Sequence, residues 1–380
     1  MTPKRYLIFF LCSFFALSAL VVGANVVVDP YSVIGAPRFD GLNQYKVDIN
    51  SRVRLSKSYQ PLRADFNTLI VGNSRVEMGI DPENKCLNLN GKKTYNLGIP
   101  GAGVGYQAAS ALNLVYQKPI KTILISVDFT DFLVMSKKPV PETYSGIPKL
   151  SNISMKADGS QNRGYLWSYV KDHYQAIYSL DAFLSSLKTV LLQSPYGPSR
   201  NESGFNPAMD FVEMTSAEGV GRLFKQKEDE LESKYMEGWG LYYSGGELSH
   251  DFNYLEEFIT RATDKGIKVV VFTNPLHENF WGIMGRAGLM EQNEIFLNQV
   301  QDIISRSGNG LVDFWDFSGD TPFIHESVIE AREKGVGLKW FWEPAHYKKE
   351  LGDMMVETMF SEACGTKQVF GEQVISSSIY

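Results

Sequence analysis

The chain has 380 residues, of which 44% are hydrophobic and 21% are charged, and its formal net charge is −6 at pH 7. This balance is that of an ordinary globular protein, long enough for one large domain or for one domain with a sizeable insertion. The acidic balance and the lack of a dense Lys/Arg run in the sequence argue against nucleic acid as a partner.

The N-terminus carries two basic residues, Lys4 and Arg5, followed by an uncharged apolar run over residues 6–28. The run is about the length of a bilayer span, and the basic residues before it favour a cytoplasmic N-terminus with the rest of the chain exported. In one interpretation, residues 1–28 are a transmembrane signal anchor that holds the main domain in the periplasm or outside the cell. In the other, they are a secretory signal cut after Ala24. Because the apolar run continues past Ala24, we favour the anchor.

Residues 29–64 are rich in turn-forming and basic residues, which is typical of a connecting region on the surface of a domain. From residue 65 to residue 380, strand and helix patterns alternate. This alternation predicts an α/β domain in which helices cover both faces of a parallel sheet. The expected strands lie over residues 66–73, before Gly98 within 93–107, and over 122–127, 269–273 and 311–314.

The alternation is interrupted between about residues 134 and 246. Helical periodicity over 165–193 and 217–240 predicts a mostly helical insertion that caps one edge of the sheet. In open parallel sheets, ligands bind beyond the carboxyl ends of the strands. Four candidate site residues fall directly after predicted strands and are expected at that edge: Ser74, Gly98, Asp128 and Asn274.

Two cysteines, Cys86 and Cys364, follow the apolar run. An oxidising compartment permits a disulfide between them, but their separation in sequence says nothing about their distance in space, so two free thiols are an equally open alternative. No pair of cysteines in the sequence has the spacing of a zinc site.

The turn over residues 72–74 presents a serine after the first strand. Serine becomes a nucleophile when a base, usually histidine, takes its proton and a carboxylate orients that histidine. Of the five histidines, His346 follows Glu343 in a carboxylate-x-x-His pattern, so these two residues are the candidate base and acid. The alternative for Ser74 is a helix N-cap in a capping box with Glu77.

This set of motifs resembles the SGNH/GDSL hydrolase superfamily over residues 65–130 and 250–362. In that superfamily a serine follows the first strand in a Gly-Asp-Ser turn, a glycine and an asparagine after the next two strands supply oxyanion donors, and an Asp-x-x-His completes the triad. The resemblance implies a flavodoxin-like three-layer sandwich that needs no metal and no organic cofactor. The roles that it implies are Ser74 as nucleophile, His346 as base, Glu343 as orienting acid, and the Ser74 and Gly98 N–H groups as oxyanion donors, with Gly101 as a rival of Gly98.

The chain departs from the pattern of the superfamily at three positions. Asn73 replaces the usual acid before the serine, Glu343 replaces the aspartate of the triad, and Asp128 stands where the family has its asparagine donor. An ionised carboxylate only accepts hydrogen bonds. Loss of one oxyanion donor typically lowers the rate by a factor of about 10²–10³, so Asp128 is expected to be a polar group at the strand edge.

Three further residues are candidates for substrate binding. Arg75 follows the serine directly, and a pairing with a carboxylate such as Asp128 is its favoured alternative role. Asn274 and His277 follow the fourth predicted strand, where the turn at Pro275 offers a purely structural explanation.

The sequence therefore predicts an exported SGNH-like serine esterase or O-acyltransferase. The topology resembles membrane-anchored members of the superfamily that are linked to acyl modification of cell-surface polymers. The expected substrate is then an acylated carbohydrate of the cell envelope or the extracellular space, or a small ester. The alternative is a catalytically inactive SGNH-like module that binds a glycan or a membrane-protein partner during modification or export of envelope polymers.

Overall fold

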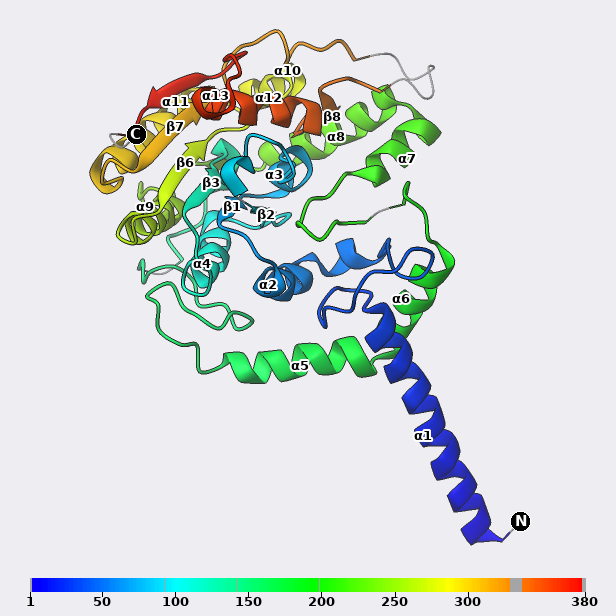
Figure 1. Ribbon diagram of the computed structural model, residues 1–380. Helices are drawn as coiled ribbons and strands as arrows, with labels where there is room; N and C mark the ends of the chain where they lie inside the picture. The colour runs from blue at the N-terminus through cyan, green and yellow to red at the C-terminus, as the bar shows by residue number, and fades with distance from the viewer. Residues whose placement is uncertain (1, 92, 142, 198, 329–336, 378–380) are drawn as a thin grey trace.

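A six-stranded sheet organises the computed structural model, which describes residues 2–91, 93–141, 143–197, 199–328 and 337–377 (Figure 1). The strands, in spatial order, are β10 (Glu372–Ile375), β7 (Val312–Asp316), β6 (Lys268–Phe272), β3 (Thr122–Ser126), β1 (Thr68–Val71) and β2 (Thr94–Asn96). The strands from β7 to β2 run parallel, and β10 pairs with β7 in the antiparallel direction. The predicted α/β class with a mostly parallel sheet is confirmed, whereas the edge strand β10 was not predicted.

Helices cover both faces of this sheet. The helices of the described residues, of which α1, α5 and α6 lie away from the sheet, are α1 (Pro3–Val28), α2 (Val53–Arg63), α3 (Ser74–Gly79), α4 (Val104–Val115), α5 (Tyr165–Tyr178), α6 (Leu180–Leu191), α7 (Met209–Glu218), α8 (Val220–Tyr235), α9 (His250–Thr263), α10 (Glu278–Arg286), α11 (Met290–Ser307), α12 (Lys349–Met359) and α13 (Ser361–Cys364). Side chains alternate between the two faces along a strand. In β1, Leu69 and Val71 belong to the hydrophobic cluster that contains α4, α9 and α11, and Ile70 belongs to the cluster that contains α3 and α12.

The insertion predicted over about residues 134–246 lies between β3 and α9, and its helices divide into two parts. Its second part, α7 and α8, lies beside the short hairpin of β8 (Phe341–Glu343) and β9 (His346–Tyr347). Its first part, α5 and α6, packs against α1 instead of the sheet (Figure 1). The helix predicted over 165–193 is broken at Ser179, whose hydroxyl accepts the N–H of Ala182 at 3.0 Å and caps α6.

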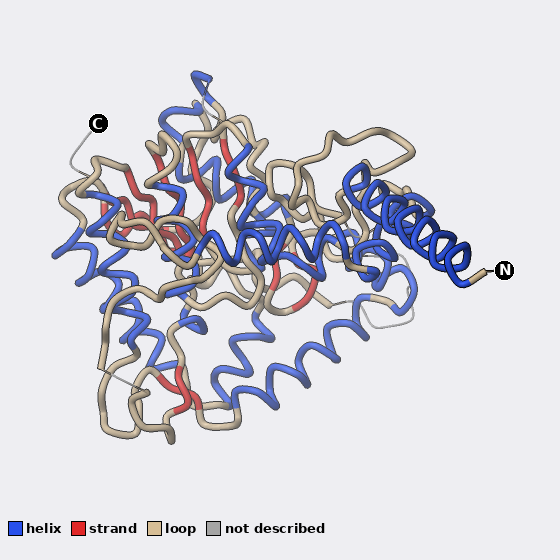
Figure 2. The backbone as a smooth tube through the Cα atoms, turned by 90° about the horizontal axis from the view of Figure 1, so that it is seen from below, coloured by secondary structure: helices blue, strands red, loops and turns tan. Residues whose placement is uncertain are grey.

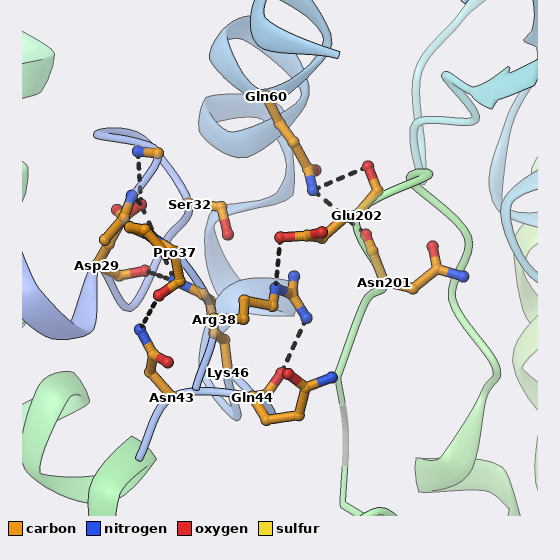
Figure 3. A network of polar contacts seen from close by, with 12 residues as sticks. Asp29, Ser32, Pro37, Arg38, Asn43, Gln44, Lys46, Gln60, Asn201 and Glu202 are labelled. Atoms are coloured by element: carbon orange, nitrogen blue, oxygen red, sulfur yellow. Dashed lines mark hydrogen bonds and ion pairs between the residues drawn. The ribbon is translucent and has the colours of Figure 1, made fainter. Parts of the chain in front are cut away.

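The segment over residues 29–64 is built into the domain, contrary to its predicted place on the surface. It contains α2, in which Lys57 is buried and donates to the carbonyl oxygens of Asn96 at 2.6 Å and Gly204 at 2.5 Å. Arg38 forms an ion pair of 3.5 Å with Glu202 (Figure 3). Basic side chains can be buried here because carbonyl and carboxylate groups from distant segments receive them.

Helix α1 projects from the rest of the protein (Figures 1 and 2). Among the described residues it is the one helix long and apolar enough to cross a membrane, with a mean hydropathy of 2.5 over an 18-residue window in which no residue is buried. Such a helix near the N-terminus fits a signal anchor or a signal peptide.

Cys86 and Cys364 form a disulfide with their Cα atoms 5.3 Å apart. The bond decides between the two alternatives that the sequence left open. Cys86 lies in the segment after α3, and Cys364 ends α13, which follows α12. The disulfide therefore joins the part of the chain that follows Ser74 to the part that follows His346.

Replacing both cysteines, as in Cys86→Ala/Cys364→Ala, is expected to lower the free energy of unfolding by about 2–5 kcal/mol, because a cross-link over a long loop restricts the unfolded chain. Urea denaturation of the full chain in detergent micelles, followed by tryptophan fluorescence, measures this change. Cys12→Ala is the matched control, since Cys12 is free and exposed. Equal stability of the double variant and the wild type would show that the bond does not stabilise the fold.

Candidate active site

Ser74 is the first residue of α3, directly after β1 and a two-residue turn. The residue that caps this helix is Asn73, whose side-chain oxygen accepts the N–H of Arg75 at 2.9 Å. Because Asn73 takes the capping role, the Ser74 hydroxyl is left for other contacts. The alternative prediction, with Ser74 as the cap, is therefore wrong.

Glu77 has no capping role either. Its carboxylate is buried and forms an ion pair with Arg200 at 2.6 Å, and Lys57 lies 3.9 Å away. These partners come from the loop before α7 and from α2, so the residues next to the serine are fixed by two distant segments. The pairing explains why the Ser74–Glu77 spacing looks like a capping box in sequence without being one.

His346 and Glu343 face each other across the β8–β9 hairpin, where they are register partners. The Ser74 Oγ lies 2.7 Å from the His346 Nε2, within hydrogen-bond distance. On the other side of the ring, Nδ1 contacts the Glu343 carboxylate. With the proton on Nδ1, directed to the carboxylate, Nε2 is free to accept the serine proton. The structure thus brings the three predicted residues together in one continuous chain of contacts.

The Glu343 carboxylate is only 1% exposed. Burial by itself raises the pKa of Glu343, but the His346 imidazole and the Ala345 N–H, which donates to Oε2 at 3.1 Å, outweigh it and hold the pKa below its usual value. The group is therefore ionised at neutral pH. An ionised carboxylate here fixes the ring orientation and stabilises the imidazolium that forms when the serine is deprotonated.

Steric packing holds the serine helix against the histidine hairpin. A Cβ on Gly79 would lie 2.1 Å from the ring of Tyr347, and a Cβ on Gly352 would lie 1.8 Å from the carbonyl oxygen of Gly79. Only glycine at both positions lets α3, β9 and α12 approach this closely. Arg75 adds a polar contact, from its Nε to the carbonyl oxygen of Ala345 at 2.9 Å.

Beneath the serine, Asp128 accepts hydrogen bonds from several segments. Arg75 Nη1 lies 3.0 Å from its carboxylate, which confirms the predicted pairing of these two residues. The side-chain amides of Asn73 and Asn274 donate to Asp128 at 2.8 and 2.9 Å, and Tyr347 donates to Asn274 at 2.8 Å. Asp128 is 3% exposed and uses its carboxylate as an acceptor for these groups, so it does not supply an oxyanion donor.

The three predicted substrate-binding residues, Arg75, Asn274 and His277, are all buried and use their donors on protein groups. His277 Nε2 lies 2.8 Å from the carbonyl oxygen of Glu326, and its ring packs between Phe224 and Phe341. In this structure these side chains hold the framework of the site together.

The backbone N–H groups that could donate to an oxyanion differ from the predicted pair, those of Ser74 and Gly98. The N–H of Gly98 already donates to the Asn96 side chain at 2.8 Å, so it is not free for an oxyanion. The N–H of Ser74 has no acceptor among the residues that the structure describes. Gly101 is exposed, adopts a φ of +65°, and its N–H is likewise without an acceptor in the described part of the chain. The N–H of Gly98 is thus engaged, whereas those of Ser74 and Gly101 have no acceptor in the described part of the chain.

Asp131 is a member of the site that sequence reasoning missed. Asn73 donates to its carboxylate at 2.9 Å and Gln107 at 3.2 Å. Burial, together with the nearby charge of Asp128, raises the pKa of Asp131 to about 7. The spacing Asp128-x-x-Asp131 at the end of a strand is the signal that could have identified this pair.

A cavity of about 390 Å³ is lined by residues of α3, α7, β8 and α12, and none of the three triad residues is among the described residues that line it. Met78, one helical turn after Ser74, and Trp342, which precedes Glu343, are among its lining residues. Residues of α7 form another wall, and Phe211 of this helix packs near both Trp342 and the His346 ring. Four charged residues also line the cavity, Lys339, Lys348, Lys349 and Glu350, so its wall combines apolar and charged side chains.

The raised pKa of Asp131 predicts a pH dependence of stability. Between pH about 4 and about 7 the unfolded chain carries the ionised group and the folded chain the protonated one, so the free energy of unfolding falls as the pH rises, by at most about 1.4 kcal/mol per pH unit. The variant Asp131→Asn should lose this slope in urea denaturation at a series of pH values.

Asp302→Asn is the matched control for this measurement, because Asp302 is exposed on α11. Parallel pH curves for Asp131→Asn and the wild type would contradict the assignment of the raised pKa to Asp131.

A search of protein-family models finds none that matches the chain, and a search of curated proteins finds no match. What the site can do is therefore judged from its own residues. Ser74, His346 and Glu343 are the arrangement by which proteins activate a serine hydroxyl.

Proposed function

We propose that this protein is a serine esterase or O-acyltransferase. The observation that carries the proposal is the 2.7 Å contact between Ser74 Oγ and His346 Nε2, with a buried, ionised Glu343 behind the imidazole. A histidine with a purely structural role would not need both a partly exposed serine at one ring nitrogen and a buried carboxylate at the other. This order of groups suits acyl transfer through the serine.

In the proposed reaction, Ser74 Oγ attacks the carbonyl carbon of an ester while His346 Nε2 takes the hydroxyl proton. The Ser74 N–H and a second backbone N–H, for which Gly101 is the candidate, stabilise the oxyanion. His346 then gives its proton to the leaving alcohol, and an acyl-Ser74 ester remains. In the second half, His346 deprotonates water in a hydrolase, or an acceptor alcohol in a transferase, and the acyl group leaves the serine.

We propose further that the chain is a member of the SGNH/GDSL superfamily with a flavodoxin-like sheet. The support is twofold. Numbered along the chain, the parallel strands lie in the order 2-1-3-4-5, which is that of flavodoxin-like sheets. The serine follows the first strand, and the acid and base follow the last parallel strand.

The proposed substrate is an acylated carbohydrate of the cell envelope or the extracellular space. The support is α1, which suits a signal anchor that holds the domain at a membrane on the exported side. An enzyme tethered in this way acts on polymers at the cell surface or in the periplasm.

One observation favours a second candidate, a catalytically inactive module that binds a glycan or a membrane-protein partner. Asp128 replaces the donor of the superfamily, and the Gly98 N–H is engaged with Asn96. The oxyanion site therefore lacks two of its usual donors, and activity depends on backbone groups alone.

A serine-directed fluorophosphonate is expected to label the full chain, and Ser74→Ala is expected to lose the label. Hydrolysis of a small chromogenic acetyl ester should fall by about 10³-fold or more in this variant, because the nucleophile is gone. Gel fluorescence after labelling and initial ester rates are the two measurements.

Ser126→Ala is the control for the labelling, because Ser126 also ends a strand of the sheet but is buried. Labelling that persists in Ser74→Ala would refute the assigned nucleophile. A folded wild type that takes no label but retains a glycan would favour the inactive module.

Glu343→Gln is expected to lower kcat by up to about 10⁴-fold, since a neutral amide neither holds the Nδ1 proton nor stabilises the imidazolium. Glu294→Gln, a change of the same kind at an exposed position on α11, should leave kcat unchanged. Equal kcat values for the two variants would show that Glu343 does not orient the histidine.

A further inference from the structure

The outward side of α6 is apolar, and the side that packs on the protein is not. Four leucines line the outward side and are 69, 58, 42 and 77% exposed: Leu180, Leu184, Leu187 and Leu191. Small or polar residues line the buried side: Ala182, Ser185, Ser186 and Thr189. Residues at these spacings share one side of a helix. The hydrophobic stripe of α6 therefore points away from the domain, the reverse of an ordinary surface helix.

Helix α5 has an outward apolar side as well. Four residues at helical spacing are 76, 51, 62 and 53% exposed: Trp167, Val170, Tyr174 and Tyr178. We call these four residues and the four leucines of α6 the α5–α6 face. Single exposed apolar residues are common, but a continuous set marks a surface that something else covers. Two exposed lysines, Lys171 and Lys188, flank the face.

The junction of α5 and α6 is bonded to the C-terminal end of α1. The Asn25 amide of α1 donates to the carbonyl oxygens of Ile177 at 2.9 Å and Ser179 at 3.3 Å, and it accepts the Ser186 hydroxyl at 2.9 Å. Beyond the helix, the Tyr31 hydroxyl lies 3.0 Å from that of Ser185. These contacts are buried or partly buried, and they hold α5 and α6 at one level of α1.

The end of α1 is itself fixed to the domain. Asp29, which follows the helix, accepts the backbone N–H groups of residues 33–36 on its carboxylate. Lys46 is buried and donates to the carbonyl oxygen of Val28 at 2.9 Å. Its ammonium group lies 3.9 Å from the Asp29 carboxylate, and both residues are drawn in Figure 3. A bilayer that receives α1 therefore meets the domain in a defined orientation.

Along the axis of α1, Asn25 lies where the surface of a membrane spanned by this helix is expected. The exposed apolar residues of α1 run from Tyr6 to Val27, about 33 Å of helix at about 1.5 Å per residue. The hydrocarbon core of a bilayer is about 30 Å thick. Asn25 is close to the end of this stretch, so the α5–α6 junction lies at the interface of the leaflet from which α1 emerges.

We propose that the α5–α6 face lies in the headgroup region of that leaflet, beside the emerging end of α1. This rests on the proposed anchoring of the chain through α1. Trp and Tyr side chains favour membrane interfaces, and helices with an apolar side lie in the interface plane. Figure 1 shows α5 along the foot of the domain where α1 leaves it, with α3 on the far side of α2. Ser74 is the first residue of α3. Two membrane contacts would thus hold the candidate active site away from the lipid.

The test uses the full chain in nanodiscs of phosphatidylcholine, one chain per disc, with an environment-sensitive NBD probe on a single cysteine. In a Cys12→Ser background, probes are placed by Tyr174→Cys or Leu184→Cys, and by Lys225→Cys on α8 as the matched exposed control. The native Cys12 carries the probe that reports on α1. The discs contain lipid brominated near the headgroup end or near the middle of the acyl chains.

We expect blue-shifted emission and loss of fluorescence at positions 174 and 184 with lipid brominated near the headgroup, and no change at position 225. The Cys12 probe should lose fluorescence with lipid brominated deep in the chains. If Cys12 is quenched and positions 174 and 184 behave like position 225, the proposal is overturned while the anchoring stands. If Cys12 is not quenched, the anchoring itself fails and the proposal fails with it. One chain per disc prevents a second copy from covering the face.

Discussion

The buried ion pair between Arg75 and Asp128 is the contact on which the candidate site depends. Through these two residues and their hydrogen bonds, the turn after β1, the end of β3, the residues after β6 and the β8–β9 hairpin meet at one point. Removing one partner of such a pair typically costs about 3–5 kcal/mol, because the remaining charge is left buried without compensation. The pair thus fixes the relative positions of the segments that carry the Ser74 hydroxyl and the His346 imidazole.

This interaction also explains the choice of polar residues around it. The Asp128 carboxylate supplies an acceptor for the guanidinium of the residue that follows the serine and for the amide of Asn73. Asn73 in turn bridges Asp128 and Asp131, which an acid at position 73 could not do without repulsion. The three polar residues therefore form one set, in which each choice depends on the others.

Local patterns in the sequence carried the parts of the fold that are decided locally. The run over 122–127 forms a strand because its apolar, β-branched side chains favour that conformation. The carboxylate-x-x-His spacing predicts a contact correctly because a tight hairpin places Glu343 opposite His346. Ser74 was identifiable from the abrupt polar turn after an apolar strand. The contact between residues 74 and 346 needed the whole sheet and was only an expectation before the fold was known.

The features that sequence reasoning missed depend on partners far away in the chain. Glu77 looked like a capping residue because Arg200 and Lys57 are not visible from its neighbourhood. The Gly98 N–H looked free because its acceptor is the side chain of Asn96, whose orientation follows from the fold. The periodicity over 165–193 showed one amphipathic helix, but it could not show that the apolar side of α6 faces outward, since a hydrophobic stripe is the same pattern whichever way it points.

The close approach of Gly79 and Gly352 affects the candidate active site although neither residue is part of it. Neither residue has a functional group, yet the space between them determines how near a nucleophile can come to its base. A displacement of about 1 Å in such a pair can slow a reaction by about 10²-fold. The reactivity of the Ser74 hydroxyl therefore depends on two positions, more than one helical turn away, that have no side chain. A methyl group added at either position would push α3 away from the segments that carry the histidine.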